Sequence, residues 1–122
     1  MEKWEMGILG LGTDIEECNR FKKYDLENEK KFLERVFTPQ EIEYCYKSTN
    51  FHHHLAARFC AKEACIKALN DKSIPLNKIE ILKDKNGKPE IRVNIEKYKN
   101  ATLLVSISHT KDYAQAVVIW QE

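Results

Sequence analysis

The sequence predicts an α+β fold, in which an antiparallel sheet packs with a long central helix and shorter N-terminal helices. Apolar residues at helical spacing dominate the first half of the chain, up to about Leu69. Short strand-like segments fill the second half, and Asn86-Gly87 between two of them is a strong hairpin signal. Helices that gather before a run of antiparallel strands are typical of the α+β class.

The first element is a short buried strand over Ile8–Thr13, whose glycines permit close approach of another backbone. Asp14 follows the strand, and Glu17 stands three residues later, which is the spacing of a capping box. This spacing predicts a helix that begins near Ile15. The helix would carry a local basic cluster of Arg20, Lys22 and Lys23.

Three more helices follow in the first half. Phe32–Phe37 has the apolar spacing of a short amphipathic helix. Thr38-Pro39-Gln40-Glu41 is a strong start signal for the next, because it offers a Thr cap, Pro at the first helical position and Glu at the third. The long helix runs from about Phe51 to Leu69. At about 100° per residue, one of its sides carries only small side chains, namely Ala57, Cys60, Ala61, Ala64 and Ala68.

The second half contains four strands. Ile79–Leu82 and Ile91–Val93 flank the Asn86-Gly87 turn and form a β-hairpin. Leu103–Ser108 and Ala114–Trp120 are two further strands around a turn at residues 110–113.

Composition favours one soluble domain that spans residues 1–122. Apolar residues make up 43% of the chain, which is enough for a core, and the charged 32% balance to a net +1. We therefore expect no bulk binding of nucleic acid. Residues 1–5 do not resemble a signal peptide, and no run approaches the roughly 18 apolar residues of a membrane helix. The four cysteines form no C-x-x-C pair, which favours reduced thiols and a cytoplasmic protein.

Two carboxylates are candidates for a metal site, and each has a simpler structural explanation. Asp14 is either a helix cap or a metal ligand exposed where the strand ends. Glu63 and Lys67 are spaced as an ion pair that stabilises a helix by about 0.2–0.5 kcal/mol. Alternatively, Glu63 is a second oxygen ligand and Lys67 contacts a phosphate. Mg²⁺ suits such a pair, since it usually binds one or two carboxylates together with water and substrate phosphates.

His109 ends the run Val105–Thr110 and is a candidate binding residue. By strand alternation it shares a face with Leu103, Val105 and Ile107, and a lone histidine that ends an apolar face is more often a structural residue. The neighbouring Ser108 and Thr110 hydroxyls are suited to bind phosphate or ribose. His52-His53-His54 is a less convincing metal site, because consecutive residues on a helix point in different directions.

Five segments taken together resemble the holo-[acyl-carrier-protein] synthase family, the small type of 4′-phosphopantetheinyl transferase. The match runs in order from about Gly7 to Ile119. The segments are Gly10–Ile15, Phe32–Thr38, Leu55–Ala64, Asn86–Pro89 and Val105–Thr110. The resemblance implies Mg²⁺-dependent transfer of the phosphopantetheine arm of coenzyme A to a serine of apo acyl carrier protein. Adenosine 3′,5′-bisphosphate would be released, and the product would serve fatty acid biosynthesis.

The resemblance also implies roles for individual residues. Asp14 and Glu63 would bind Mg²⁺ with the pyrophosphate of coenzyme A, and Lys67 would contact the transferred phosphate. Glu63 or a water held by the metal would accept the serine proton. The coenzyme site would further include Arg58, Lys62, Gly87, Lys88, Pro89, Ser108, His109 and Thr110, with His109 near the adenosine 3′-phosphate.

Acyl carrier proteins are acidic, so the resemblance makes Arg20, Lys22 and Lys23 the expected docking cluster. The family is usually a homotrimer with sites between subunits. The sequence departs from the family at Ala57, where Gly is frequent, and at Ile66, where a small hydroxyl residue is frequent.

Two other functions use parts of the same pattern. A metal-dependent nucleotide phosphohydrolase could use Asp14 and Glu63, although two-metal hydrolases usually have more ligands. A non-catalytic module that binds carrier protein or nucleotide would not need the carboxylate pair.

Overall fold

The computed structural model describes residues 7–122 and confirms the α+β class. Residues 1–5, where we expect no signal peptide, lie outside the described part. The strands are β1 (Ile8–Glu17), β2 (Ile79–Lys83), β3 (Pro89–Val93), β4 (Thr102–His109) and β5 (Tyr113–Gln121). The α-helices are α1 (Lys30–Val36), α2 (Pro39–Tyr46) and α3 (Phe51–Leu69), and short 3₁₀ turns cover Cys18–Phe21, Leu76–Lys78 and Glu96–Tyr98.

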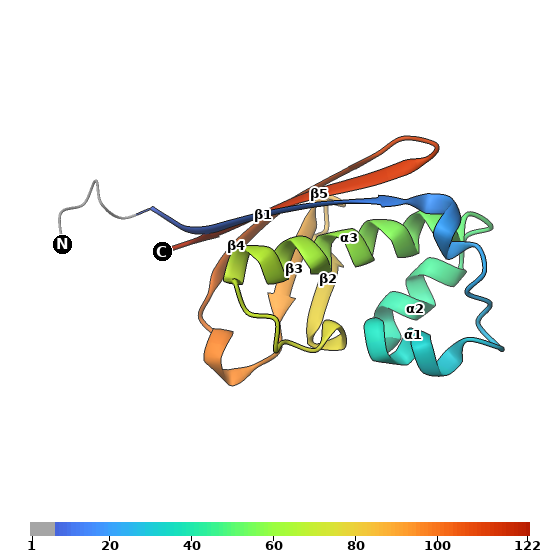
Figure 1. Cartoon of the computed structure of the whole chain (residues 1–122), viewed down its shortest axis with the longest axis horizontal. Helices are drawn as coiled ribbons and strands as arrows, with labels where there is room; N and C mark the ends of the chain where they lie inside the picture. The colour runs from blue at the N-terminus through green and yellow to red at the C-terminus, as the bar shows by residue number, and fades with distance from the viewer. Residues whose placement is uncertain (1–6) are drawn as a thin grey trace.

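The strands form two antiparallel sheets around α3. One sheet has the order β1-β5-β4, and the other is the predicted β2-β3 hairpin. In Figure 1, α3 runs along β1, while α1 and α2 lie on the other side of α3, away from that strand. The long helix is therefore the central element, and it positions residues between the sheet and the smaller helices.

The N-terminal strand continues through Asp14, so the helix that we predicted near Ile15 is wrong. Asp14, Ile15, Glu16 and Glu17 pair with Ala116, Gln115, Ala114 and Tyr113 of β5. Only one 3₁₀ turn follows, at Cys18–Phe21. Pairing with a distant strand has overridden the local capping signal, which is a common outcome when tertiary contacts compete with propensity.

Close packing of α3 on β1 explains the two glycines of the strand and the small residues of the helix. A Cβ atom added to Gly10 would lie 1.8 Å from the carbonyl oxygen of Ala68, and one added to Gly12 would lie 2.0 Å from that of Ala64. No side chain fits at these distances. The sequence expectation of close backbone approach is confirmed.

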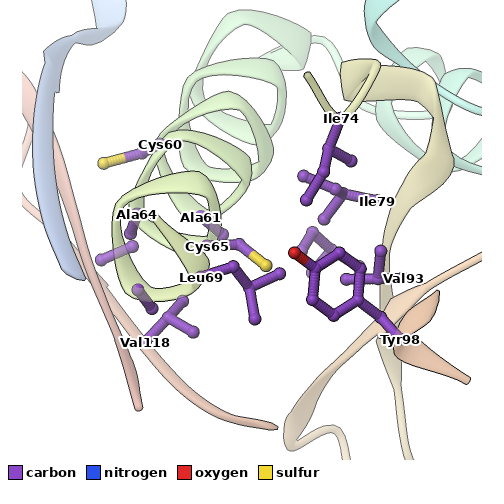
Figure 2. Packing of buried hydrophobic residues seen from close by; sticks show 13 residues of the cluster. Cys60, Ala61, Ala64, Cys65, Leu69, Ile74, Ile79, Val93, Tyr98 and Val118 are labelled. Carbon is purple, nitrogen blue, oxygen red and sulfur yellow. The ribbon is translucent and has the colours of Figure 1, made fainter. Parts of the chain in front are cut away.

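Two buried clusters pack against different parts of the long helix, one against its C-terminal half and one against its N-terminal half. Figure 2 shows the cluster formed with the hairpin and β5, in which Cys60, Cys65, Ile79, Val93 and Val118 are labelled. The second cluster joins the start of α3 to α1, α2 and the turn after β1. All four cysteines are buried free thiols. Among residues 7–122, no helix combines the length and apolar character needed to cross a membrane.

The capping box that begins α2 is confirmed and belongs to a buried charge network. Thr38 accepts a hydrogen bond from the Glu41 amide, and the Glu41 carboxylate accepts one from the Thr38 amide. The same carboxylate accepts from Lys62 of α3 at 2.6 Å and from the Ile81 amide of β2 at 2.9 Å. One buried side chain thus ties α2, α3 and β2 together.

Candidate active site

Asp14 and Lys67, predicted from segments far apart in the sequence, meet between β1 and α3. The Lys67 ammonium donates to the carbonyl of Thr13 at 2.9 Å and lies 3.4 Å from Oδ1 of Asp14. The Cys60 thiol, on the turn of α3 before Glu63, donates to the carbonyl of Asp14 at 3.0 Å. Lys67 therefore pairs with Asp14 of the strand, although its sequence spacing suggested Glu63 as the partner.

Glu63 lies near the same pair of residues. Burial raises the pKa of the Glu63 carboxyl, the negative charge of Asp14 raises it further, and Lys67 and Arg20 oppose this shift. A carboxyl whose charged form is disfavoured by a neighbouring carboxylate is typical of a site built for a cation.

The residues present fit a magnesium ion. Oδ2 of Asp14 is buried and, within the described chain, has no hydrogen-bond partner. Such an orphaned oxygen is destabilising unless a donor or a cation satisfies it. Between residues 7 and 122, no three His, Cys, Asp or Glu side chains converge to hold an ion without other ligands. Water and substrate phosphates would complete the shell, as is usual for Mg²⁺.

Glu16 is a third carboxylate at this site that our sequence analysis missed. It shares the inner face of β1 with Asp14 and forms an ion pair with Arg20. Burial raises its pKa to about 7, and Asp14 and Glu63 add to the shift while Arg20 opposes it. The signal was present as strand alternation from Asp14 to Glu16, but the predicted helix at Ile15 concealed it.

The basic cluster lies just beyond β1. Arg20 stacks over the rings of Phe21 and Phe59 at 5.2 Å, and it lines an open hollow of about 640 Å³ with Ile15, Glu16, Glu17, Asn19 and Tyr113. Lys22 and Lys23 are exposed. Of these three cations, Arg20 alone forms an ion pair with a carboxylate of the described chain, namely Glu16.

His109 ends β4 on the same sheet row as Glu16. Ala114 of β5 pairs with His109 on one side and with Glu16 of β1 on the other. His109 and Glu16 are therefore two strand spacings apart, roughly 10 Å. The His109 ring stacks with His53 at 6.3 Å, and a His53 ring nitrogen contacts the carbonyl of Lys111 at 3.0 Å. Ser108 lies on the opposite face of the strand. The Thr110 hydroxyl accepts from the amides of Asp112 and Tyr113.

The hairpin turn presents Lys88 and Pro89 beside β4. Gly87 has a φ of +82°, a left-handed conformation that favours glycine, and its amide donates to the Asp84 carbonyl. Lys88 and Pro89 line a cleft of about 660 Å³ together with Leu103, Val105 and Ile107 of β4. The hairpin and the middle of β4 therefore face a common space, whereas His109 at the end of the strand does not line it.

Arg58 and Lys62, which we expected in one coenzyme site, lie one turn apart on α3 but have different surroundings. Lys62 is fully buried, and its ammonium donates to the carbonyls of Val36 and Leu76 and to Glu41. An ammonium has three protons, so no donor remains for a ligand. We correct the assignment of Lys62 to a core role. Arg58 has no carboxylate partner among the described residues and stacks on Tyr44 at 4.2 Å.

Comparisons with known proteins show which family the chain resembles. Residues 10–118 match the family model described as 4′-phosphopantetheinyl transferase superfamily. A holo-[acyl-carrier-protein] synthase of Thermodesulfovibrio yellowstonii is 42% identical over 113 residues, which cover 92% of this chain and 97% of that protein. The Clostridium tetani protein of the same name is 41% identical over 120 residues, with coverages of 92% and 94%.

Two solved structures resemble this fold closely. The holo-(acyl-carrier-protein) synthase of Bacillus anthracis, in complex with CoA (3′,5′-ADP), has a TM-score of 0.79 at 33% identity and covers 94% of this chain and 97% of its own. The Helicobacter pylori synthase in complex with coenzyme A has a TM-score of 0.78 at 36% identity, with coverages of 91% and 99%.

Proposed function

The chain belongs to the 4′-phosphopantetheinyl transferase superfamily, as a member of the holo-[acyl-carrier-protein] synthase family, and from this premise we propose how its residues act. The enzyme transfers 4′-phosphopantetheine from coenzyme A to apo acyl carrier protein. The observation that carries our assignment of the reacting centre is the meeting of Asp14 and Lys67 between β1 and α3, with Oδ2 of Asp14 lacking a hydrogen-bond partner in residues 7–122.

Asp14 and Glu63 would hold Mg²⁺ against the pyrophosphate of coenzyme A. When bound, the ion supplies neutralisation of the charge on the phosphate oxygens, which is the main requirement of phosphoryl transfer. Lys67 extends its ammonium from α3 beside Asp14 and would contact the transferred phosphate from there. The raised pKa of Glu63 makes its carboxylate a suitable acceptor for the proton of the attacking serine.

The nucleotide end of coenzyme A would lie between the hairpin and the end of β4. The cleft lined by Lys88 and Pro89 supports this placement. Gly87 allows the tight turn that presents them, and His109, with Ser108 and Thr110 beside it, would contact the ribose and its phosphate. The carrier protein would dock on Arg20, Lys22 and Lys23, close to the carboxylates that face its serine.

We further propose a homotrimer with sites between subunits. The sheet face turned away from α3 exposes a set of large apolar side chains: Leu9, Leu11, Ile15, Leu104 and Tyr113, each at least 47% exposed. Apolar patches of this kind typically mark protein interfaces. Sedimentation velocity should give one species of three times the chain mass, and Leu11→Lys should shift it to monomer. A monomeric wild type would contradict the trimer.

We place this enzyme in the cytoplasm, where it would serve fatty acid biosynthesis. Incubation with apo acyl carrier protein, coenzyme A and Mg²⁺, followed by mass spectrometry of the carrier, tests the transfer. We expect the carrier to gain one phosphopantetheine, and the gain to require Mg²⁺. Hydrolysis of the coenzyme without any gain would instead indicate a phosphohydrolase. Glu63→Gln should abolish the gain and Glu34→Gln, exposed on α1, should retain it.

A further inference from the structure

Arg20 differs from the other two cations of the expected docking cluster, because it is paired within its own chain. Its guanidinium forms an ion pair with Glu16 at the end of β1. The Arg20 side chain is 48% exposed, whereas that of Glu16 is only 12% exposed. Lys22 and Lys23 form no ion pair within residues 7–122. The net positive charge of this surface therefore comes from the two lysines.

Aromatic rings hold the Arg20 guanidinium beside Glu16. Its central carbon lies 5.2 Å from the ring centres of both Phe21 and Phe59. Phe21 is fully buried in the turn after β1, and Phe59 lies on α3. Arg20 and Glu16 both line the open hollow of about 640 Å³. A partner's carboxylate that enters this hollow therefore meets the guanidinium and its internal partner together.

Glu16 would lose its counterion if a partner drew Arg20 away. In the described chain, Arg20 is the only cation that forms an ion pair with the Glu16 carboxylate. Asp14 and Glu63 lie close enough for their negative charges to act on Glu16, and Lys67 is already paired with Asp14. Separation of a largely buried carboxylate from its cation is costly. A partner must offset this cost before it gains a contact with Arg20.

We propose that Glu16 competes with the acidic carrier protein for Arg20 and thereby restrains docking. The inference rests on the proposed function, in which the carrier docks on Arg20, Lys22 and Lys23. The two lysines attract any acidic protein, because their charges are not compensated. Arg20 rewards only a partner whose carboxylate reaches the hollow and replaces Glu16. The internal ion pair thus adds selectivity at the cost of affinity, which is a common way to discriminate between similar partners.

Binding of apo acyl carrier protein, measured by fluorescence anisotropy without coenzyme A or Mg²⁺, tests this competition. Glu16→Gln should lower the Kd about three- to fivefold, because Arg20 then has no charged internal partner. Binding to this variant should also weaken more steeply with added salt than binding to wild type, since one more exposed charge contacts the carrier. Glu17→Gln removes an equal charge at the same hollow and should change the Kd less than about twofold.

A double-mutant cycle shows whether Glu16 acts through Arg20. Arg20→Met should weaken binding less than about twofold in wild type, but about three- to fivefold in the Glu16→Gln background. Thermal unfolding of each variant checks that the fold is kept. Equal losses in both backgrounds would overturn the inference, since Glu16 would then act only as a nearby charge. Weaker binding of Glu16→Gln than of wild type would also overturn it, because Glu16 would then present Arg20 to the carrier.

The binding assay separates this inference from the proposed transfer. If wild type never modified the carrier but showed the Arg20-dependent gain on Glu16→Gln, the transferase proposal would fail and the competition would stand. If wild type modified the carrier and its Kd did not respond to Glu16→Gln, the competition would be wrong and the transferase proposal would stand. Absence of measurable binding in both wild type and Glu16→Gln would likewise overturn the competition.

Discussion

The Lys67 ammonium lies 3.4 Å from Oδ1 of Asp14, so the cation expected at the transferred phosphate is in contact with an expected metal ligand. The pair joins the second half of β1 to the last turn of α3, and Lys67 strengthens this connection by donating to the Thr13 carbonyl as well. Oδ1 of Asp14 is thus held by the lysine, while Oδ2 is without a partner in the described chain and is free for a cation.

Lys67→Met should therefore impair the chemical step more than the fold. Loss of one preorganised charge at a reacting oxygen typically costs about 10²-fold in kcat. Lys67 is largely exposed, so the melting temperature should change little. Carrier modification under saturating substrates measures kcat, with Lys72→Met as an exposed control. A Lys67→Met enzyme with wild-type kcat would exclude a contact with the phosphate.

Glu16 should make the stability of the metal-free protein fall as pH rises. The pKa of Glu16 is raised to about 7 in the folded state, against an ordinary value of 4.5. Between pH 4.5 and pH 7, the folded state therefore binds the Glu16 proton more tightly than the unfolded state does. The free energy of unfolding then decreases across this window and stays lower above pH 7. Because the carboxyl retains some contact with water, we expect Glu16→Gln to be more stable than wild type by only about 1 kcal/mol at pH 8.

Wild type and Glu16→Gln should differ little in stability near pH 4.5, where the side chain at position 16 is neutral in both folded proteins. Urea unfolding in the presence of EDTA at several pH values measures the difference. Glu17→Gln is the matched control, since Glu17 is exposed on the outer face of the same strand. Identical pH dependence in wild type and Glu16→Gln would show that Glu16 is not perturbed.

Removal of one partner from the buried ion pair of Lys62 and Glu41 should destabilise the protein strongly, and removal of both partners should destabilise it less. Burial lowers the pKa of Lys62, and Glu41 opposes that shift. Lys62→Met leaves the Glu41 carboxylate buried without its partner and should cost about 3–5 kcal/mol. The double variant Lys62→Met/Glu41→Gln should recover part of this loss. Lys47→Met, which breaks an exposed pair with Glu43, should cost at most about 1 kcal/mol in the same denaturation assay.

Regular elements were predictable because their signals are local. The Thr38 capping box, the Asn86-Gly87 turn and the apolar spacing of α3 act within a few residues, and all are confirmed. Two predictions were wrong, the helix near Ile15 and the coenzyme role of Lys62, because contacts with distant segments decide the structure there. Pairing with β5 extends β1 through Asp14 and thereby places Glu16 on the same face as Asp14, an expected metal ligand. Glu41, 21 residues before Lys62, draws that lysine into the core. The pairing of Glu41 with Lys62 leaves no periodic trace in the sequence, and the strand alternation from Asp14 to Glu16 was concealed by the predicted helix.

The expected docking of acyl carrier protein should depend mainly on Lys22 and Lys23, because Arg20 is already paired with Glu16. Reversal of both lysines to Glu should raise the KM for the acidic carrier about tenfold at low salt, since steering between opposite charges accelerates encounter. The KM for coenzyme A should not change. Added salt should raise the wild-type KM toward that of the variant, because exposed charges are screened.

Lys30→Glu/Lys31→Glu, an equal charge change on exposed residues of α1, is the control. If both double variants raised the KM for carrier equally, net charge rather than a defined docking cluster would explain the effect.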